Sequence, residues 1–172
     1  SPVHIMTTLD FVNAPLQTAD FVRVVEGKGG ERGGGFRRGP GGPMGPGPRP
    51  EIPPIGKVDV KSGLITGLIV SDTQKTVAVP SLPLTPNAAV KNDGPGVLDL
   101  TGPNAFTLTL GRHPGLGKTA TALGRTIAGL DLLKTVKAGD PIRSIRIVRV
   151  GQAARDFQTD DESFKKLTET RR

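Results

Sequence analysis

Apolar residues recur along the chain in short runs that turn-forming residues separate. Five runs have the length and the Val, Ile and Leu content of β-strands: residues 58–60, 64–70, 76–79, 97–100 and 106–110. A sixth run, residues 144–150, places Arg146 and Arg149 among Ile and Val and is also strongly β-prone. Many short strands with few helices are typical of a β-barrel or a β-sandwich, and they disfavour a parallel α/β sheet.

One short helix is predicted near the N-terminus. Asn13 can cap this helix, Pro15 suits its first position, and Gly27 can end it. Between these limits, apolar side chains share one helical face, namely Phe21, Val24 and Val25.

Two more helices are predicted in the second half of the chain. Residues 130–136, which Gly139 follows, have the pattern of one brief helix. In the C-terminal tail, Thr159 and Glu162 have the spacing of a capping box. Two apolar residues then follow on one helical stripe, Phe164 and Leu167, so we expect a terminal helix.

Residues 27–56 interrupt this pattern with twelve Gly and seven Pro, which oppose helix and ladder formation. Flexible glycines dominate its first half, and the stretch from Pro40 to Pro54 favours extended, polyproline-like conformations. Such a segment buries too little apolar surface to offset its own ordering entropy. We therefore expect either a partner protein or the surface of the domain to hold it.

Composition excludes several classes of function. The 172 residues suffice for one ordinary domain. The absence of Cys excludes disulfides and thiolate chemistry, and two histidines, His4 and His113, leave little for a metal site, so no cofactor is predicted. No apolar run approaches the roughly 18–20 residues that span a bilayer, so membrane contact would be peripheral. The net charge of +7 favours anionic partners in general.

The last third of the chain carries a specific motif pattern. Leu110-Gly111 is followed by Pro114 and Leu116, then by residues 124–131, and finally by residues 139–151. In order and spacing these residues resemble the cyclophilins, a family of peptidyl-prolyl isomerases. That family has a Leu-Gly pair, a Pro and a Leu, then the motif GRVxxGMDVxxxI and a closing strand.

Shorter stretches extend the resemblance. Residues 14–21 match the A-P-x-x-x-x-N-F start of the family's first helix, with Asp20 in place of Asn. Residues 67–71 are similar to its G-x-L-S-M-A strand, and residues 152–172 are similar to an extension found on some bacterial members.

The resemblance implies a mainly β fold, a closed antiparallel barrel of eight strands with two capping helices. The barrel would occupy residues 1–151 and carry residues 27–56 as an extended arm, and residues 152–172 would form a C-terminal helical extension. Closing the sheet would remove exposed edges, which allows a small chain without disulfides to persist. A two-sheet sandwich remains the alternative.

The resemblance also indicates which residues catalysis would need. Prolyl isomerisation crosses a barrier of roughly 18–20 kcal/mol, and a cation near the amide nitrogen weakens the resonance behind that barrier. In the cyclophilins an Arg, a Gln and several aromatic side chains line the groove. Here the Phe-x-Arg element corresponds to residues 36–38, which makes Arg38 the one catalytic candidate. The Gly and Pro that follow Arg38 replace the expected hydrophobic strand, and no Gln lies between Gln17 and Gln74.

The second wall of the groove is also depleted. Relative to the family pattern, Phe106 keeps the aromatic that faces the core, and Leu116 is the retained groove residue. Four other positions hold smaller side chains than the family has: Ala105 for a Gln, Thr107 for an aromatic, Gly115 for a Trp and Ala120 for a His. We therefore expect little or no isomerase activity.

Two other signals are weaker. Residues 111–119 suggest a phosphate-binding loop, but Arg112 stands where a Walker A motif needs its first Gly. His113, next to a Pro in that loop, is expected to be a solvated side chain. The Arg-Gly tripeptide that begins at Arg32 resembles RNA-binding tracts, yet those tracts work through repetition and this one occurs once.

The sequence therefore favours a non-catalytic, cyclophilin-like structural subunit that is extrinsic to a larger protein assembly. Peripheral contact with a membrane complex is one setting for it. Residues 27–56 would form its interaction arm through six residues: Arg32, Phe36, Arg37, Arg38, Met44 and Arg49. The alternatives are a residual prolyl isomerase that uses Arg38, and RNA or anionic-surface binding through the Arg/Gly-rich segment, although the pattern disfavours nucleic acid. The compartment is left open between cytoplasm and periplasm.

Overall fold

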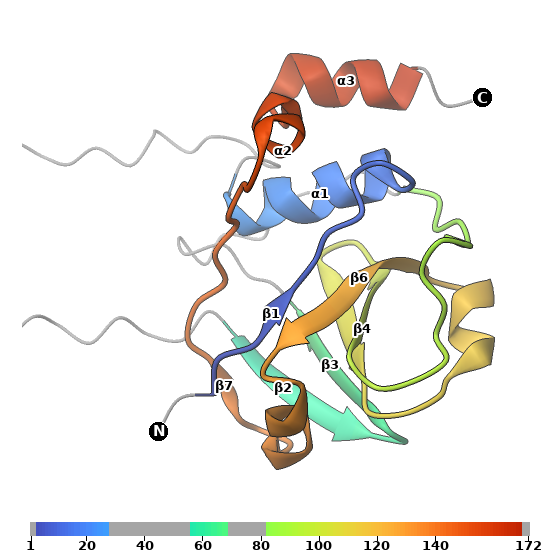
Figure 1. Ribbon diagram of the computed structural model, residues 1–172, viewed down its shortest axis with the longest axis vertical. Coiled ribbons are helices and arrows are strands. Elements are labelled where there is room, and N and C mark those ends of the chain that lie inside the picture. Colours follow the sequence, from blue (N-terminus) through green and yellow to red (C-terminus); the bar gives the residue numbers. More distant parts are fainter. Residues whose placement is uncertain (1–2, 28–55, 69–81, 170–172) are drawn as a thin grey trace, which may run out of the picture.

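The computed structural model describes residues 3–27, 56–68 and 82–169. In this part of the chain seven strands form one antiparallel sheet in the order β1-β6-β4-β5-β3-β2-β7, which curls into a half-barrel (Figure 1). The strands are β1 (Met6–Thr7), β2 (Gly56–Lys61), β3 (Leu64–Leu68), β4 (Val97–Gly102), β5 (Ala105–Thr109), β6 (Thr121–Ala128) and β7 (Pro141–Ile142).

The α-helices lie at one end of this sheet (Figure 1). The three α-helices are α1 (Pro15–Val25), α2 (Gln152–Asp156) and α3 (Asp161–Glu169), and the 3-10 helices are η1 (Pro114–Lys118) and η2 (Leu130–Thr135). In Figure 1, α1 lies over the end of the curled sheet and α3 lies beyond α1. Leu16 and Ala19 of α1 pack with Phe164 of α3 in a small second core.

The hairpin of β2 and β3 shows how the local sequence sets the register. Lys61 pairs with Leu64, so the turn contains only Ser62 and Gly63, whose φ angles are 55° and 75°. Two positive φ angles are what a two-residue type I′ turn requires, and its twist matches that of the strands. The hairpin places β3 beside β5, where Thr66 pairs with Thr107.

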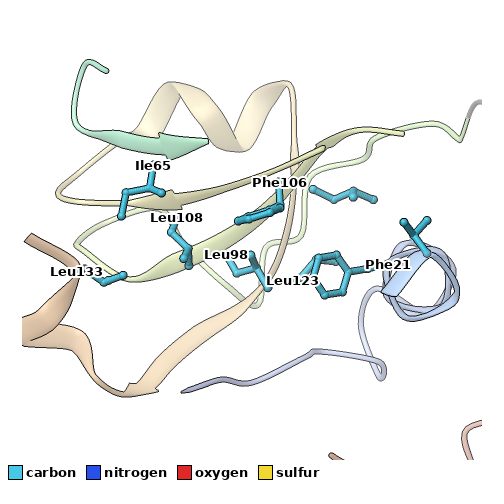
Figure 2. Close-up of a cluster of buried hydrophobic side chains, with 9 residues drawn as sticks. Phe21, Ile65, Leu98, Phe106, Leu108, Leu123 and Leu133 are labelled. Carbon is cyan, nitrogen blue, oxygen red and sulfur yellow. The ribbon is translucent and has the colours of Figure 1, made fainter. Parts of the chain in front are cut away.

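The main core lies inside the curl of the sheet. Alternate residues of β4 and β5 point into it because successive side chains of a strand face opposite sides. Figure 2 shows Phe21 of α1 reaching toward Leu98 and Leu123. The buried members of this cluster are Phe21, Val24, Ile65, Leu98, Leu100, Phe106, Leu108, Leu123 and Leu133.

Most of the predicted strands in the described residues are confirmed. Residues 58–60, 97–100 and 106–110 fall on β2, β4 and β5, and β3 covers the first part of the run 64–70. The run 76–79 and residues 69–70 lie outside the described residues. The prediction of a strand at 144–150 is wrong, because this segment has no ladder partner in the part of the chain that the structure describes.

This prediction failed because β-propensity measures how well side chains fit a half-buried surface, and it does not show whether the backbone has a partner strand. The ladder between β2 and β7 ends where Gly56 pairs with Ile142. Beyond Ile142 the side chains still alternate: Ile145 and Ile147 are half-buried against the core, while Val148 is 64% exposed. The apolar pattern of this segment therefore arises because one side of it packs against the core, although it is not a strand.

The three predicted helices form, but two have caps other than those predicted and one is a 3-10 helix. Ala14, and not Asn13, is the N-cap of α1, because the side chain of Asn13 donates to both carboxylate oxygens of Asp10 at 3.0 and 3.1 Å. In α3 the N–H of Ser163 donates to Oδ2 of Asp160 at 3.4 Å, so the predicted capping box of Thr159 and Glu162 is wrong. Residues 130–135 form the 3-10 helix η2.

Arg23 joins the C-terminal helix to α1. Its guanidinium donates to the carbonyl oxygen of Thr159 at 2.8 Å and pairs with Oδ1 of Asp161, also at 2.8 Å. The same group lies 4.6 Å from the centre of the Phe164 ring, a cation–π contact. The residue is only 8% exposed, so these contacts compensate for burying its charge.

The finer parts of the fold prediction stay predictions. The described sheet has β1 and β7 as its edges, and closure of the barrel is not established. The arm at residues 27–56 falls almost wholly outside the described residues. The boundary between residues 151 and 152 is likewise untested.

Candidate functional site

A row of polar residues crosses the sheet on the face opposite to the core. Thr107 of β5 pairs with Thr66 of β3 on one side and with Asp99 of β4 on the other. Directly paired residues of antiparallel strands project to the same face. Because Leu98 and Leu100 point into the core, Asp99 and its partners lie on the other face of the sheet.

Two members of this polar row are buried, and Thr66 is half-buried. Asp99 is 0% exposed and Thr107 is 4% exposed. The side-chain amide of Asn92 donates to Oδ2 of Asp99 at 2.7 Å, whereas Oδ1 of Asp99 and Oγ1 of Thr107 have no hydrogen-bond partner among the described residues. Burial raises the pKa of Asp99 to about 6, against the opposing effects of the Asn92 hydrogen bond and the charge of His113.

The segment that precedes β4 is fixed by hydrogen bonds. The Thr109 hydroxyl donates to the carbonyl oxygen of Gly94 at 2.9 Å and accepts from the N–H of Val97 at 2.9 Å. The N–H of His113 donates to the carbonyl oxygen of Asn92 at 2.9 Å. Asn92 thus connects the buried carboxyl to the loop after β5.

The described positions where the resemblance expects one wall of the groove present little side-chain surface. Thr107 and Ala120 are 4% and 1% exposed, so neither presents a side chain to a ligand. Gly115 is exposed but has no side chain, and Leu116 is half-buried. Phe106 packs in the main core, which confirms its predicted direction.

The residues predicted for the arm cannot be placed in this site. Arg32, Phe36, Arg37, Arg38, Met44 and Arg49 all lie outside the described residues. The candidate cation, Arg38, is one of them. The polar row itself was missed at the sequence level, because an Asp between two Leu residues in a strand is typical of a solvated outer face.

A surface hollow of about 380 Å³ lies next to the polar row. We call it the basic hollow: its lining comes from residues 86–93 and 112–118 and includes Lys91, Arg112 and Lys118. Asn92, which holds Asp99, is also part of its lining.

Hydrogen bonds and one ion pair hold the lining residues of the basic hollow in place. The side-chain amide of Asn87 donates to Oδ2 of Asp10 at 3.0 Å and to the carbonyl oxygen of Ala122 at 2.9 Å. Hydrogen bonds from Asn87 and Asn13 lower the pKa of Asp10, although its partial burial acts in the opposite direction. Arg125 donates to the carbonyl oxygen of Lys91 at 3.0 Å and pairs with Oδ1 of Asp93 at 3.2 Å.

Two kinds of site are not formed in the described residues. The loop at 111–119 contains a five-residue 3-10 helix, η1, and leads into β6, whereas a phosphate-binding loop of the Walker type leads into a longer α-helix. Within residues 3–27, 56–68 and 82–169, no three His, Cys, Asp or Glu side chains gather as metal ligands would. No helix in the same ranges is long and apolar enough to cross a membrane.

Comparison with known proteins identifies the fold. No family model matches the chain. A cyclophilin-type peptidyl-prolyl cis-trans isomerase of Cryptosporidium parvum, solved in the presence of the dipeptide Ala-Pro, is similar with a TM-score of 0.56 and 16% sequence identity. The match covers 84% of this chain and 92% of that chain. A second structure of the isomerase has the same TM-score and identity and covers 86% of this chain and 92% of that chain.

At this identity the likeness establishes the fold and not the activity. The chain has a cyclophilin-like fold, as its sequence motifs predicted.

Proposed function

We propose that this chain is a non-catalytic interaction subunit with a cyclophilin-like fold, held in a larger protein assembly by the arm at residues 27–56. One observation carries the proposal: Thr107 and Ala120, which stand where isomerases of this fold have aromatic and His side chains, are small and buried. A proline ring needs an apolar wall to rest on, and these positions supply almost no accessible surface.

The polar row itself supplies no cation of the kind that catalysis needs. Lowering the barrier to prolyl rotation needs a positive group near the amide nitrogen. The residue opposite Thr107 is Asp99, whose side chain is acidic and buried. The cation would have to come from elsewhere, and Arg38 is the candidate.

Arg38 therefore decides between the proposal and its main alternative, a residual isomerase. The purified full chain is assayed with a proline peptide in a protease-coupled reaction. We expect no turnover above the uncatalysed rate, both for the full chain and for Arg38→Ala. Turnover that Arg38→Ala abolishes would establish the isomerase and overturn the proposal.

The binding role is tested separately with the arm. In extract of the source cells, the full chain is expected to migrate on a native gel as part of a large assembly, and a variant with residues 28–55 replaced by a short linker is expected to migrate alone. If the linker variant still enters the assembly, the arm is not the anchor. The RNA alternative predicts instead an affinity for single-stranded RNA that falls steeply with salt and disappears in the linker variant.

A further inference from the structure

The basic hollow carries a net positive charge that the described part of the protein does not neutralise. Its lining includes Lys91, Arg112 and Lys118, against the single carboxylate of Asp93. Arg125 pairs with Asp93 at 3.2 Å and so occupies that one carboxylate. The three lining cations are exposed, and none of them forms an ion pair with a residue that the structure describes.

The same hollow is also apolar. Pro86, Ala88, Val90 and Pro114 contribute to its lining. A ligand that used the whole surface would therefore combine acidic groups with apolar ones. Such a lining excludes a purely hydrophobic ligand. A bare inorganic anion would not contact its apolar residues.

Compact phosphate sites usually rely on several free backbone N–H groups. Pro86 and Pro114 have no N–H, and the N–H of Val90 donates to the carbonyl oxygen of Asn87 at 3.2 Å. Single-stranded nucleic acid is disfavoured because no lining residue is aromatic, so bases have nothing to stack on. An acidic peptide needs neither feature.

The hollow is formed before any ligand arrives. Asn87 and Arg125 hold one wall from behind, and Asn92 is fixed to Asp99 on one side and to the N–H of His113 on the other. A wall that is already ordered lowers the entropy cost of binding.

We infer that the basic hollow binds an acidic, apolar peptide segment of a partner protein, with its carboxylates against Lys91, Arg112 and Lys118. The inference rests on the proposed binding role and adds to it a second contact, separate from the arm. The peptide's apolar side chains pack on the surface made by Pro86, Val90 and Pro114.

The test is a selection of short peptides from a randomised library on the immobilised full chain. We expect enrichment of peptides in which Asp or Glu stands beside Leu, Val or Ile. Affinity for a selected peptide should fall with rising salt, and it should fall about tenfold or more in the variant Lys91→Glu, Arg112→Glu, Lys118→Glu. Circular dichroism checks that this variant folds, as expected for three exposed positions.

The matched control reverses three exposed lysines that do not line the hollow, Lys57, Lys134 and Lys165, and should keep the affinity within about twofold. If both variants lost affinity for the peptide equally, the change in net charge alone would explain the loss, and the inference would be overturned. Selection of neutral or basic peptides, or of none, would also overturn it. The inference would also be overturned if inorganic phosphate or single-stranded RNA displaced the selected peptide at concentrations too low to weaken its binding through ionic strength alone.

The two proposals fail independently. If the library yields no acidic, apolar peptide and the chain shows no prolyl turnover, the peptide site is ruled out and the non-catalytic role stands. Prolyl turnover that depends on Arg38 removes that role whatever peptides the hollow selects.

Discussion

Asn92 donates its side-chain amide to Oδ2 of Asp99 at 2.7 Å, and this bond joins the lining of the basic hollow to the buried face of the sheet. Asn92 is 6% exposed and Asp99 is 0% exposed, so neither group can exchange this partner for bulk water. The other oxygen of the Asp99 carboxyl, Oδ1, has no hydrogen-bond partner among the described residues.

Replacing Asn92 with Ala should therefore destabilise the fold. The substitution leaves the buried carboxyl without its donor, and an orphaned buried polar group costs about 1–3 kcal/mol. Urea unfolding measures the change. The control, Gln158→Ala, removes an exposed bond to the carbonyl oxygen of Arg155 and should stay within about 0.5 kcal/mol. Equal stability of Asn92→Ala and the original chain would show that the bond contributes nothing.

Stability should decrease as pH rises from about 4 to about 6. Burial raises the pKa of Asp99, and that of Asp20, to about 6, above the ordinary value of 3.8. In this window the folded state binds more protons than the unfolded state, so the free energy of unfolding falls with rising pH and levels off above it. Each carboxyl would contribute on the order of 2–3 kcal/mol.

The variant Asp99→Asn isolates one of these groups. Its amide has a similar shape and no charge, so the variant should be more stable than the original chain above pH 6 and should show a shallower pH dependence. Urea unfolding at several pH values measures both effects. Asp10, whose pKa is lowered, acts in the opposite direction, because its contribution is lost as pH falls. An unchanged slope in Asp99→Asn would mean that this carboxyl ionises normally.

Replacing Arg23 with Ala should release α3 from α1. The change removes the hydrogen bond to Thr159, the ion pair with Asp161 and the contact with the Phe164 ring. Amide hydrogen exchange should then speed up across α3 by about tenfold or more, while the strands keep their protection. Lys165→Ala, at an exposed position of the same helix, is the control and should leave exchange unchanged.

Replacing Gly124 with Ala should strongly disturb β6. A Cβ at this position would overlap the backbone carbonyl of Thr8, which crosses close to the strand. Backbone has to move to relieve the overlap, so we expect a loss of about 2 kcal/mol or more in thermal or urea unfolding. Gly115→Ala is the control, because its Cβ would meet no atom within 4 Å. A fully stable Gly124→Ala protein would contradict the close crossing.

Several elements were predictable because neighbours in the sequence encode them. Pro15 and the apolar face behind it predicted α1, the run 106–110 predicted β5, and the motif spacing after Leu110 predicted the cyclophilin-like fold. The resemblance of residues 104–108 to a groove segment of the family predicted that Phe106 faces the core. These features depend on local geometry, on the alternation of side chains and on the order of motifs, all of which a single chain displays.

Other features required the folded chain. Residues 144–150 have the composition of a strand, but a ladder needs a partner that composition does not supply. Asp99 sits in a strand as an outer-face residue would, yet it is 0% exposed and accepts a hydrogen bond from Asn92 of the preceding loop. The basic hollow likewise combines two segments separated in the sequence. Tertiary structure decides such cases because pairing, burial and charge compensation depend on residues that are distant along the chain and meet only after folding.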